Sequence, residues 1–353
     1  MVAILMGGVL FFWKEISAAR LDFSFREDQN ELQEVNLESL RSPIFDLAIS
    51  PFGDVLIYRN HHGIVNRQNL VNDTQDGSPS GEIDPGGRCE LMLLSPIENK
   101  LVSALDDGQI ILDDLNRPGS EQTVLANSGG VPECMAFSPD GRFVAGGLEN
   151  GTVIVWDVVK NTTATVFRRK RQNPSSLIFD SQMGLFVSFE SGLERWQLTL
   201  NDEFSSSEKG RGNQRQMDWR IDQPAAREMI LTNDGKVLIA ASFDNHVRCW
   251  DLESRELKWE FRGVLPCARS LRFSPDESFF VCQSEVQTLH FRDVETGEEL
   301  ASLEDSSMGT GTGARFSLDG KLLYSASSDG LIRIWTVPGR ALIGTVETDA
   351  LQF

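Results

Sequence analysis

The stretch CMAFSPDGRFVAGGLENGTVIVWDV, which runs from Cys134 to Val158, decides the fold. It contains two apolar runs of strand length on either side of the turn sequence Ser138-Pro139-Asp140-Gly141, then a second turn at Asn150-Gly151 and a third, nearly uninterrupted apolar run. Gly, Asn and Asp tolerate the positive φ that tight hairpin turns need, and a strand without polar alternation is typically covered on both faces. The stretch therefore predicts three consecutive antiparallel strands, the third of them buried on both sides.

The turn sequence recurs along the chain in degraded copies. These begin at Ser50, Ser95, Ser138, Asp180, Thr232, Ser274 and Ser317, so that successive copies start 45, 43, 42, 52, 42 and 43 residues apart. The one long interval contains the polar stretch 201–216, which we interpret as a loop insertion. A regular period of this length indicates a repeat architecture of seven units.

A fourth, more polar run ends each unit, as in RELKWEF (255–261) and RALIGTV (340–346), and its polarity suits an outer edge. So small a four-stranded sheet cannot bury both of its faces, and neighbouring units must cover them. Because the chain shows no helical periodicity from Leu40 onward, a radial stack of sheets closed around an axis is the arrangement that remains. The sequence predicts an all-β fold over residues 31–353: a seven-bladed β-propeller of four-stranded antiparallel blades.

Two units end their third run with Trp156-Asp157 and Trp250-Asp251, and on these residues and the turns the chain resembles the WD-repeat β-propeller family over roughly residues 40–350. The resemblance implies a buried hydrogen-bond network in each blade, made by an Asp of the second turn, a Trp, a Ser or Thr, and a His at the blade entry. The residues at the Asp and Trp positions are Asp107, Asp244, Asp329, Trp156, Trp196, Trp250 and Trp335. No blade entry carries the His, so we expect incomplete networks in which these residues are structural.

Closure of the ring has two candidate strands, Glu31–Glu38 before the first unit and Ala341–Glu347 after the last. Members of the family usually donate an N-terminal strand to the last blade. The resemblance therefore favours Glu31–Glu38.

Composition limits the partners. Lys and Arg number 33 against 52 Asp and Glu, and the resulting net charge of -19 repels phosphate backbones and anionic lipids, so nucleic acid is not expected as a partner of this acidic protein. Five cysteines are widely spaced in apolar runs, which indicates buried free thiols and no disulfide framework. They are Cys89, Cys134, Cys249, Cys267 and Cys282.

Residues 1–30 form a separate apolar N-terminal segment and linker. Residues 2–13 carry no charge but would span only about 18 Å as a helix, short of a bilayer core of about 30 Å. Two interpretations of this segment stay open. It is either a secretory signal or a truncated membrane anchor, or it is a packed terminal segment or an artefact of the chosen start. The chain is accordingly expected in the cytoplasm or at a membrane through residues 1–20.

Catalytic chemistry finds little support in the sequence. The four histidines lie outside the expected channel, and HExxH, GxSxG and phosphate-loop motifs are missing, so no catalytic residue, metal or cofactor is expected. The turn Asp293–Gly297 resembles one in quinone-cofactor propeller dehydrogenases, which Asp251–Trp259 echoes loosely, but any propeller needs a tight turn there. The pairs Asp106-Asp107 and Asp113-Asp114 flank a strand and fit a solvated edge better than a cation site.

Two features are candidate partner-binding sites. The first is the basic run Arg168, Arg169, Lys170 and Arg171, on the rim between the third and fourth units, which suits an acidic peptide or a solvated loop. The second is the position five residues before each first turn, expected near the channel mouth. It holds Phe45, Glu90, Glu133, Ser175, Arg227, Arg269 and Thr312, so that Glu90 and Glu133 would face Arg227 and Arg269 and polarise the mouth.

The sequence thus predicts a non-catalytic, monomeric scaffold whose loops bind protein or peptide partners. Two alternatives remain: an enzymatic or cofactor-holding propeller similar to the quinoproteins, and the sensor or docking part of a membrane-anchored signalling protein.

Overall fold

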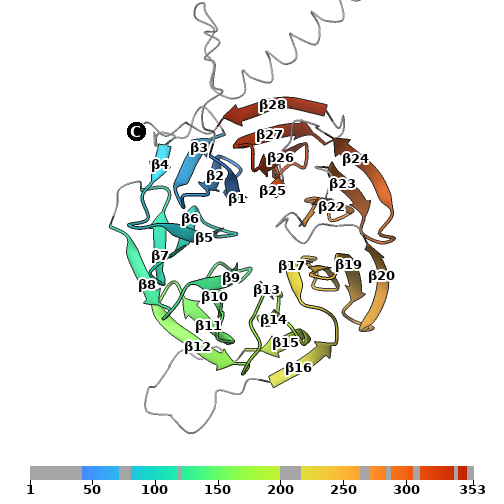
Figure 1. The fold of residues 1–353 in the computed structure, drawn as a ribbon, viewed down its shortest axis with the longest axis horizontal. Helices are drawn as coiled ribbons and strands as arrows, with labels where there is room; N and C mark the ends of the chain where they lie inside the picture. The colour runs from blue at the N-terminus through green and yellow to red at the C-terminus, as the bar shows by residue number, and fades with distance from the viewer. Residues whose placement is uncertain are drawn as a thin grey trace, which may run out of the picture.

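The computed structural model describes residues 42–70, 81–117, 121–198, 216–262, 271–283, 288–304, 311–337 and 341–347. In these residues the chain forms seven four-stranded antiparallel sheets around a central channel, which confirms the predicted seven-bladed propeller (Figure 1). Residues 1–30 and the candidate strand Glu31–Glu38 lie outside the described residues.

The strands follow one another in chain order, four to a blade. Blade 1 comprises β1 (Ile44–Ile49), β2 (Val55–Asn60), β3 (Val65–Asn69) and β4 (Gly81–Ile83); blade 2, β5 (Cys89–Leu94), β6 (Lys100–Leu105), β7 (Gln109–Asp114) and β8 (Thr123–Asn127). Blade 3 comprises β9 (Pro132–Phe137), β10 (Phe143–Leu148), β11 (Thr152–Asp157) and β12 (Thr162–Arg168); blade 4, β13 (Ser176–Phe179), β14 (Gly184–Phe189), β15 (Gly192–Gln197) and β16 (Gln216–Ile221). Blade 5 comprises β17 (Ala226–Leu231), β18 (Val237–Ser242), β19 (His246–Asp251) and β20 (Glu256–Arg262); blade 6, β21 (Arg272–Phe273), β22 (Phe279–Gln283), β23 (Thr288–Asp293) and β24 (Glu299–Glu304). Blade 7 comprises β25 (Gly311–Phe316), β26 (Leu322–Ser327), β27 (Leu331–Thr336) and β28 (Ala341–Glu347).

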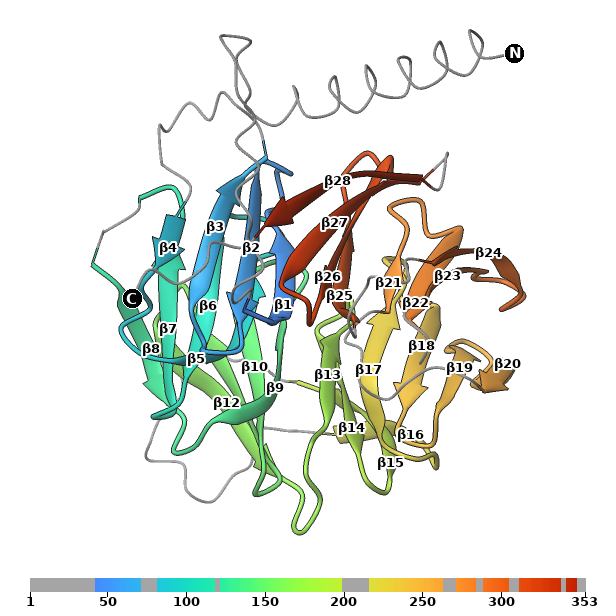
Figure 2. The same cartoon turned by 45° about the horizontal axis from the view of Figure 1, so that its top comes forward.

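Each blade places its first strand beside the channel and its fourth strand at the outer edge (Figure 1). The strands run through the thickness of the ring from one face to the other (Figure 2). The turns between second and third strands and the connections into the first strands therefore share one face, which we call the mouth face. The Ser-Pro-Asp-Gly-type turns lie at the opposite face.

The hydrophobic core is divided among the seven contacts between neighbouring blades. One cluster joins each pair; between blades 3 and 4, for example, Phe143 and Phe167 pack with Leu185 and Phe189. Each sheet is thus covered by its neighbours, and burial of these side chains is worth about 1.5–3 kcal/mol apiece. This distributed core is what the repeat required, since no blade could bury its faces alone.

Ring closure differs from the expectation. The outer strand of the last sheet is Ala341–Glu347, which pairs with β27 in antiparallel register, and the prediction that Glu31–Glu38 would occupy this edge is wrong. Every sheet is therefore built from four consecutive strands. The ring is closed between blades 1 and 7 by packing, with Leu47 and Tyr58 against Ala326 and Ile332.

The second strands, not the third, are the most completely buried. All six residues of β2, β10 and β14 are buried, whereas β11 alternates between buried and half-buried positions over its first residues. The second strand lies between the first and third strands of its own sheet, and its two faces are covered by the two neighbouring blades. This position explains why it carries small and apolar residues such as Gly146 and Gly147, where an added Cβ would lie 2.7 Å from the Trp156 ring and 2.6 Å from Pro174.

The first turns are closed by their own side chains, as the sequence pattern requires. In blade 3 the Gly141 amide donates to the Ser138 carbonyl at 2.9 Å and the Phe143 amide to Ser138 Oγ at 2.9 Å. In six of the seven turns the fourth residue adopts a positive φ, for which glycine is suited; Glu98 in the turn of blade 2 does not. Met183 and Glu277 adopt it too, with φ of 62° and 58°, which explains how degraded copies keep the turn.

Four of the five cysteines, Cys89, Cys134, Cys249 and Cys282, are buried free thiols, as predicted; Cys267 lies outside the described residues. Within the described part of the chain, no helix has the length and apolar character needed to cross a bilayer.

Candidate functional site

The position predicted for the channel mouth coincides with a recurring β-bulge. Between first and second strands the pairing skips Phe45, Glu90, Glu133, Arg227 and Thr312, one residue in each of five blades. A bulged residue leaves the regular pleat, and bulges commonly redirect a side chain at a functional rim. In these five blades the repeat thus places one irregular residue at the start of the first strand, next to the channel.

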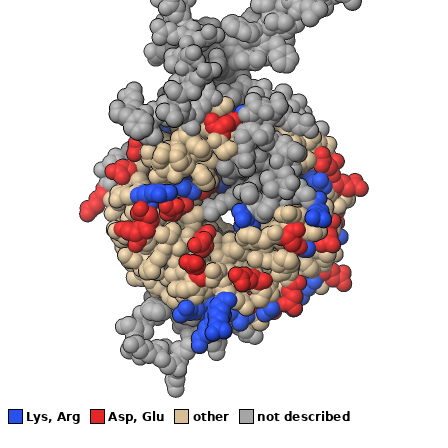
Figure 3. All heavy atoms as spheres, viewed as in Figure 1, with Lys and Arg blue, Asp and Glu red and all other residues tan. Residues whose placement is uncertain are grey.

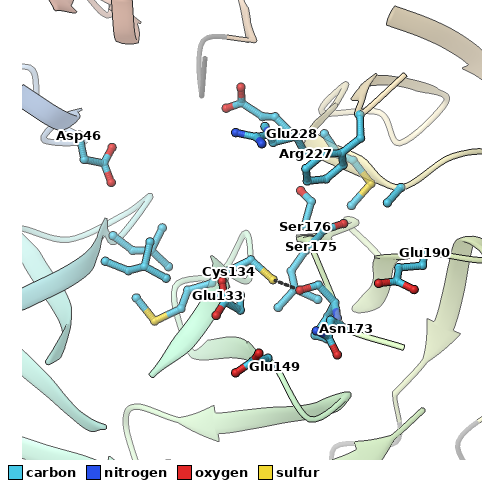
Figure 4. A pocket seen from close by; sticks show the side chains of 18 of the residues that line it. Asp46, Glu133, Cys134, Glu149, Asn173, Ser175, Ser176, Glu190, Arg227 and Glu228 are labelled. Atoms are coloured by element: carbon cyan, nitrogen blue, oxygen red, sulfur yellow. Dashed lines mark hydrogen bonds between the residues drawn. The ribbon is translucent and has the colours of Figure 1, made fainter. Parts of the chain in front are cut away.

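A cavity of about 840 Å³ occupies the channel and opens on the mouth face. Its walls are first strands, which contribute apolar side chains such as Leu93 and Met135. Its rim is made by turns of the mouth face, which contribute Glu149, Glu190 and Phe243 (Figure 4). The volume lies within the range of ordinary ligand pockets.

Two arginines of the channel wall are already paired across blade boundaries. Arg272 of β21 forms an ion pair with Glu228 of β17, whose second carboxylate oxygen accepts the Leu271 amide at 2.9 Å. Arg315 of β25 lies 3.9 Å from Asp46 of β1, measured from Nη2 to Oδ1. These pairs link blade 5 to blade 6 and blade 7 to blade 1, so their charges are largely compensated inside the protein.

The remaining charges of the cavity are unevenly distributed. Glu133, Glu149 and Glu190 are exposed on blades 3 and 4, and none of them has a hydrogen-bond or ion-pair partner among the described residues. Figure 3 shows acidic side chains at the channel rim over β9, β10, β13 and β14. On the other side Arg227 stacks on Phe243, with Cζ 4.6 Å from the ring centroid. One side of the rim is therefore acidic, and the described residues supply no partner for its carboxylates.

The other predicted mouth residues take different roles. Glu90 pairs with Arg88 at 3.1 Å and does not line the cavity. Ser175 lines it, but its Oγ donates to the Ala226 carbonyl of blade 5 at 2.7 Å. Arg269 lies outside the described residues. Of the four charged residues expected to face one another across the mouth, only Glu133 and Arg227 are therefore seen to line the cavity.

The basic run lies at the predicted place, where β12 ends on the mouth face. Figure 3 shows basic side chains gathered there. Arg169, however, pairs with the fully buried Glu194 of β15, and Arg168 Nε donates to the Asn150 carbonyl at 3.0 Å. Lys170 and Arg171 are exposed. The run is therefore partly a structural link and only partly free for a partner.

The repeat-signature residues lie in the scaffold. Trp156 and Trp335 are buried, and Trp335 Nε1 donates to Ser325 Oγ at 2.8 Å; Trp196 and Trp250 are half-buried and donate to Glu194 and Gln223.

The turn aspartates accept backbone and side-chain bonds. Asp107 accepts from the Gln109 amide at 2.9 Å. Asp244 and Asp329 each accept a hydrogen bond from an arginine of the third strand that follows. Arg248 Nη2 donates to Asp244 Oδ2 at 2.6 Å, and Arg333 Nη2 donates to Asp329 Oδ2 at 2.7 Å. In these two blades an arginine of the third strand therefore donates to the turn Asp, a role that the family resemblance assigns to a histidine at the blade entry. Burial raises the pKa of Asp329, but hydrogen bonds from Arg333, Ser327 and the Leu331 amide outweigh it, and the pKa lies below its ordinary value.

Chemistry-bearing residues do not converge elsewhere in the described part of the chain. None of the four histidines lines the cavity, and no group of three or more His, Cys, Asp or Glu side chains there is arranged to hold a metal ion. The turn Asp293–Gly297 receives Trp259 of blade 5, whose Nε1 donates to the Val294 carbonyl at 3.0 Å. That turn therefore helps to dock one blade on the next.

Sequence reasoning missed Glu149 and Glu190. Both precede the second turn of their unit, before Asn150-Gly151 and Ser191-Gly192. The signal was available, since these turns and the first-strand entries must lie at the same face of an antiparallel meander. Aligning both positions would have placed the two residues beside Glu133.

A closed ring of seven radial four-stranded sheets with a charged central mouth defines a seven-bladed β-propeller. The model of the family "WD domain, G-beta repeat" matches residues 119–157, 228–251 and 304–336. The chain belongs to the WD40-repeat β-propeller family.

Relatives are distant. The chain is 24% identical over 220 residues to periodic tryptophan protein 2 of Arabidopsis thaliana, a match covering 61% of this chain and 23% of that protein. It is 25% identical over 267 residues to a guanine nucleotide-binding protein subunit beta of Oryza sativa subsp. japonica, covering 68% and 66%. It is 25% identical over 236 residues to WD repeat-containing protein 18 of Danio rerio, covering 62% and 53%. The match thus spans less than two thirds of each of these relatives.

Proposed function

We propose that this protein is a non-catalytic scaffold that binds a peptide segment of a protein partner in the cavity of the mouth face. WD40 propellers typically act as protein interaction scaffolds, which supports the general class. The observation that carries the specific site is the cavity of about 840 Å³, whose rim holds three carboxylates without a partner among the described residues.

The walls of the cavity favour recognition without rearrangement. They are first strands, each paired in its own sheet and packed on neighbouring blades, so the cavity is formed before a partner arrives. A preformed site avoids the ordering cost of a flexible loop, which is a main expense of binding. The rim residues come from turns, where side chains vary at little cost to the fold.

Catalysis draws no support from the cavity. Among the described lining residues the one thiol, that of Cys134, is buried and lies 3.5 Å from the Pro174 carbonyl, and none is a histidine. A nucleophile without an adjacent base is a weak catalytic group.

Selection from a phage-displayed library of random dodecapeptides tests the proposed site. Asn173 is exposed on the cavity wall, and Asn173→Trp would fill part of the cavity. Val159, 73% exposed in the β11–β12 turn at the opposite face, offers the matched control Val159→Trp. Selected peptides should bind the wild-type and Val159→Trp proteins alike and lose binding to Asn173→Trp. Equal binding to all three proteins, or no selected peptide, would refute the site.

Residues 1–30 carry a separate proposal, that they form a signal or membrane anchor. Membrane fractionation of the intact chain and of a chain lacking residues 1–30 tests it. Loss of membrane association upon deletion would support an anchor, and identical fractionation would contradict it.

A further inference from the structure

The charges of the cavity specify the chemistry of its occupant. The inference below rests on the proposed function, that the cavity binds a peptide. We infer that the partner segment presents an arginine or lysine side chain to the carboxylates of Glu133, Glu149 and Glu190.

Some of the charged side chains that line the cavity already have a partner of opposite charge within the protein. Four charged residues of the first strands line the cavity in two ion pairs, Arg272 with Glu228 and Arg315 with Asp46. An acidic side chain from a partner would compete with Glu228 or Asp46 for these two arginines. Breaking a partly buried ion pair leaves an uncompensated charge, which costs several kcal/mol. Arg272 and Arg315 are therefore less available to a carboxylate of the partner than unpaired arginines would be.

The carboxylates of Glu133, Glu149 and Glu190 are the remaining negative charges of the cavity. Glu133 comes from the bulge of β9, while Glu149 and Glu190 come from the mouth-face turns of blades 3 and 4, so three segments bring carboxylates to one side of one cavity (Figure 4). None has a partner among the described residues. Like charges grouped beside a low-dielectric wall focus a potential that attracts a cation.

An apolar surface lines the cavity beside these carboxylates. Leu93 and Met135 line the cavity and are only partly buried by their own cluster. Lys and Arg have apolar stems that pack on such surfaces while the charged head reaches polar groups. Arg227 on the opposite side, stacked on Phe243, disfavours a second cation there. A basic side chain that enters over blades 3 and 4 would meet the acidic part of the rim and would lie away from Arg227.

The experiment uses the cavity-binding dodecapeptides selected as above. Each is resynthesised with its Arg replaced by citrulline, or its Lys by norleucine, which removes the charge and keeps most of the shape. Binding to the wild-type protein should weaken about tenfold to a hundredfold, since a hydrogen-bonded charge contributes about 1.5–3 kcal/mol and 1.4 kcal/mol is a factor of ten.

Variants supply the second arm. The triple variant Glu133→Gln, Glu149→Gln and Glu190→Gln should bind the basic peptide about tenfold more weakly and the neutral one equally well. The matched control, Glu253→Gln, Glu256→Gln and Glu298→Gln, removes the same net charge from exposed positions of blades 5 and 6 and should bind as the wild type does. The citrulline arm needs no variant and stands even if a triple variant misfolds.

The outcomes separate the two proposals. Cavity-binding peptides that lack Arg and Lys, citrulline forms that bind as well as the originals, or equal losses in both triple variants would overturn the inference and leave the peptide-binding function in place. Absence of any cavity-binding peptide would overturn both.

Discussion

Arg169, in the loop after β12, donates its Nε hydrogen to Oε2 of Glu194 in β15 at 2.9 Å, and the Glu194 side chain is fully buried. Trp196 Nε1 donates to the same carboxylate at 3.1 Å, and Arg220 lies 3.6 Å from it. The pair ties blade 3 to blade 4 at the mouth face. One member of the basic run is therefore a structural residue.

Arg169→Met should lower the free energy of unfolding by about 2 kcal/mol, because it removes a main partner of a buried carboxylate while Trp196 and Arg220 compensate in part. Lys170→Met, one residue further along and exposed, is the control and should change stability by less than about 0.5 kcal/mol. Urea titration monitored by tryptophan fluorescence measures both. Equal stability of the two variants would refute the structural role of Arg169.

Gly297→Ala should destabilise the contact between blades 5 and 6. Gly297 has a φ of 71°, and an added Cβ would lie 2.7 Å from Cδ2 of the Trp259 ring. Gly129 has a φ of 75° and open space around the same position, so Gly129→Ala isolates the backbone cost of about 1–2 kcal/mol. Gly297→Ala should cost about 1–3 kcal/mol more, for the steric conflict. Thermal unfolding compares them, and a smaller loss at Gly297 than at Gly129 would argue against Trp259 docking on this turn.

Stability should depend on the ionisation of Asp329 at acidic pH. Its pKa is depressed in the folded state, because the bonds from Arg333, Ser327 and Leu331 outweigh burial. A group with a depressed folded pKa stabilises the protein above its unfolded pKa of about 4, and the stabilisation is lost as pH falls through the folded pKa. Asp329→Asn should therefore cost about 1–2 kcal/mol at pH 7 and progressively less below about pH 4.

Melting temperatures of the wild-type protein and Asp329→Asn between pH 7 and pH 2.5 provide the measurement. Glu253→Gln, in an exposed turn, is the control and should leave the curve in place. A constant difference between wild type and Asp329→Asn across this range would contradict the assignment.

The described thiols should be unreactive in the folded protein. Burial raises the pKa values of Cys89, Cys249 and Cys282 to about 12, and the thiolate is the reactive form. In a Cys267→Ser variant, a thiol reagent such as 5,5′-dithiobis(2-nitrobenzoate) at pH 8 should label essentially no thiol before unfolding and four after addition of guanidinium chloride. Rapid labelling of the native variant would show that these blades open readily.

The fold was predictable because each turn encodes its own geometry. Ser138 closes its turn with its hydroxyl, Gly141 supplies the positive φ, and the same pattern repeats at a constant period. Ring closure was not predictable in the same way. Which segment completes the last blade depends on pairing with β27, and both Glu31–Glu38 and Ala341–Glu347 have the composition of an edge strand.

The candidate site was predictable in part. Aligning the units identified Glu133 and Arg227, because a bulge falls at the same position in several blades. The pairing of Arg272 with Glu228 could not be foreseen, since the two residues meet across blades at different positions of their strands. Such contacts depend on the rotation between neighbouring sheets, which no spacing in the sequence records.

Hydrogen–deuterium exchange of the protein saturated with a cavity-selected peptide tests the central claim most directly. The account predicts protection confined to the mouth face, at 132–135, 149–151, 173–176, 190–192 and 224–229. Protection at the opposite face, in the turns 50–54, 138–142 and 317–321, or along the outer strands, would contradict it.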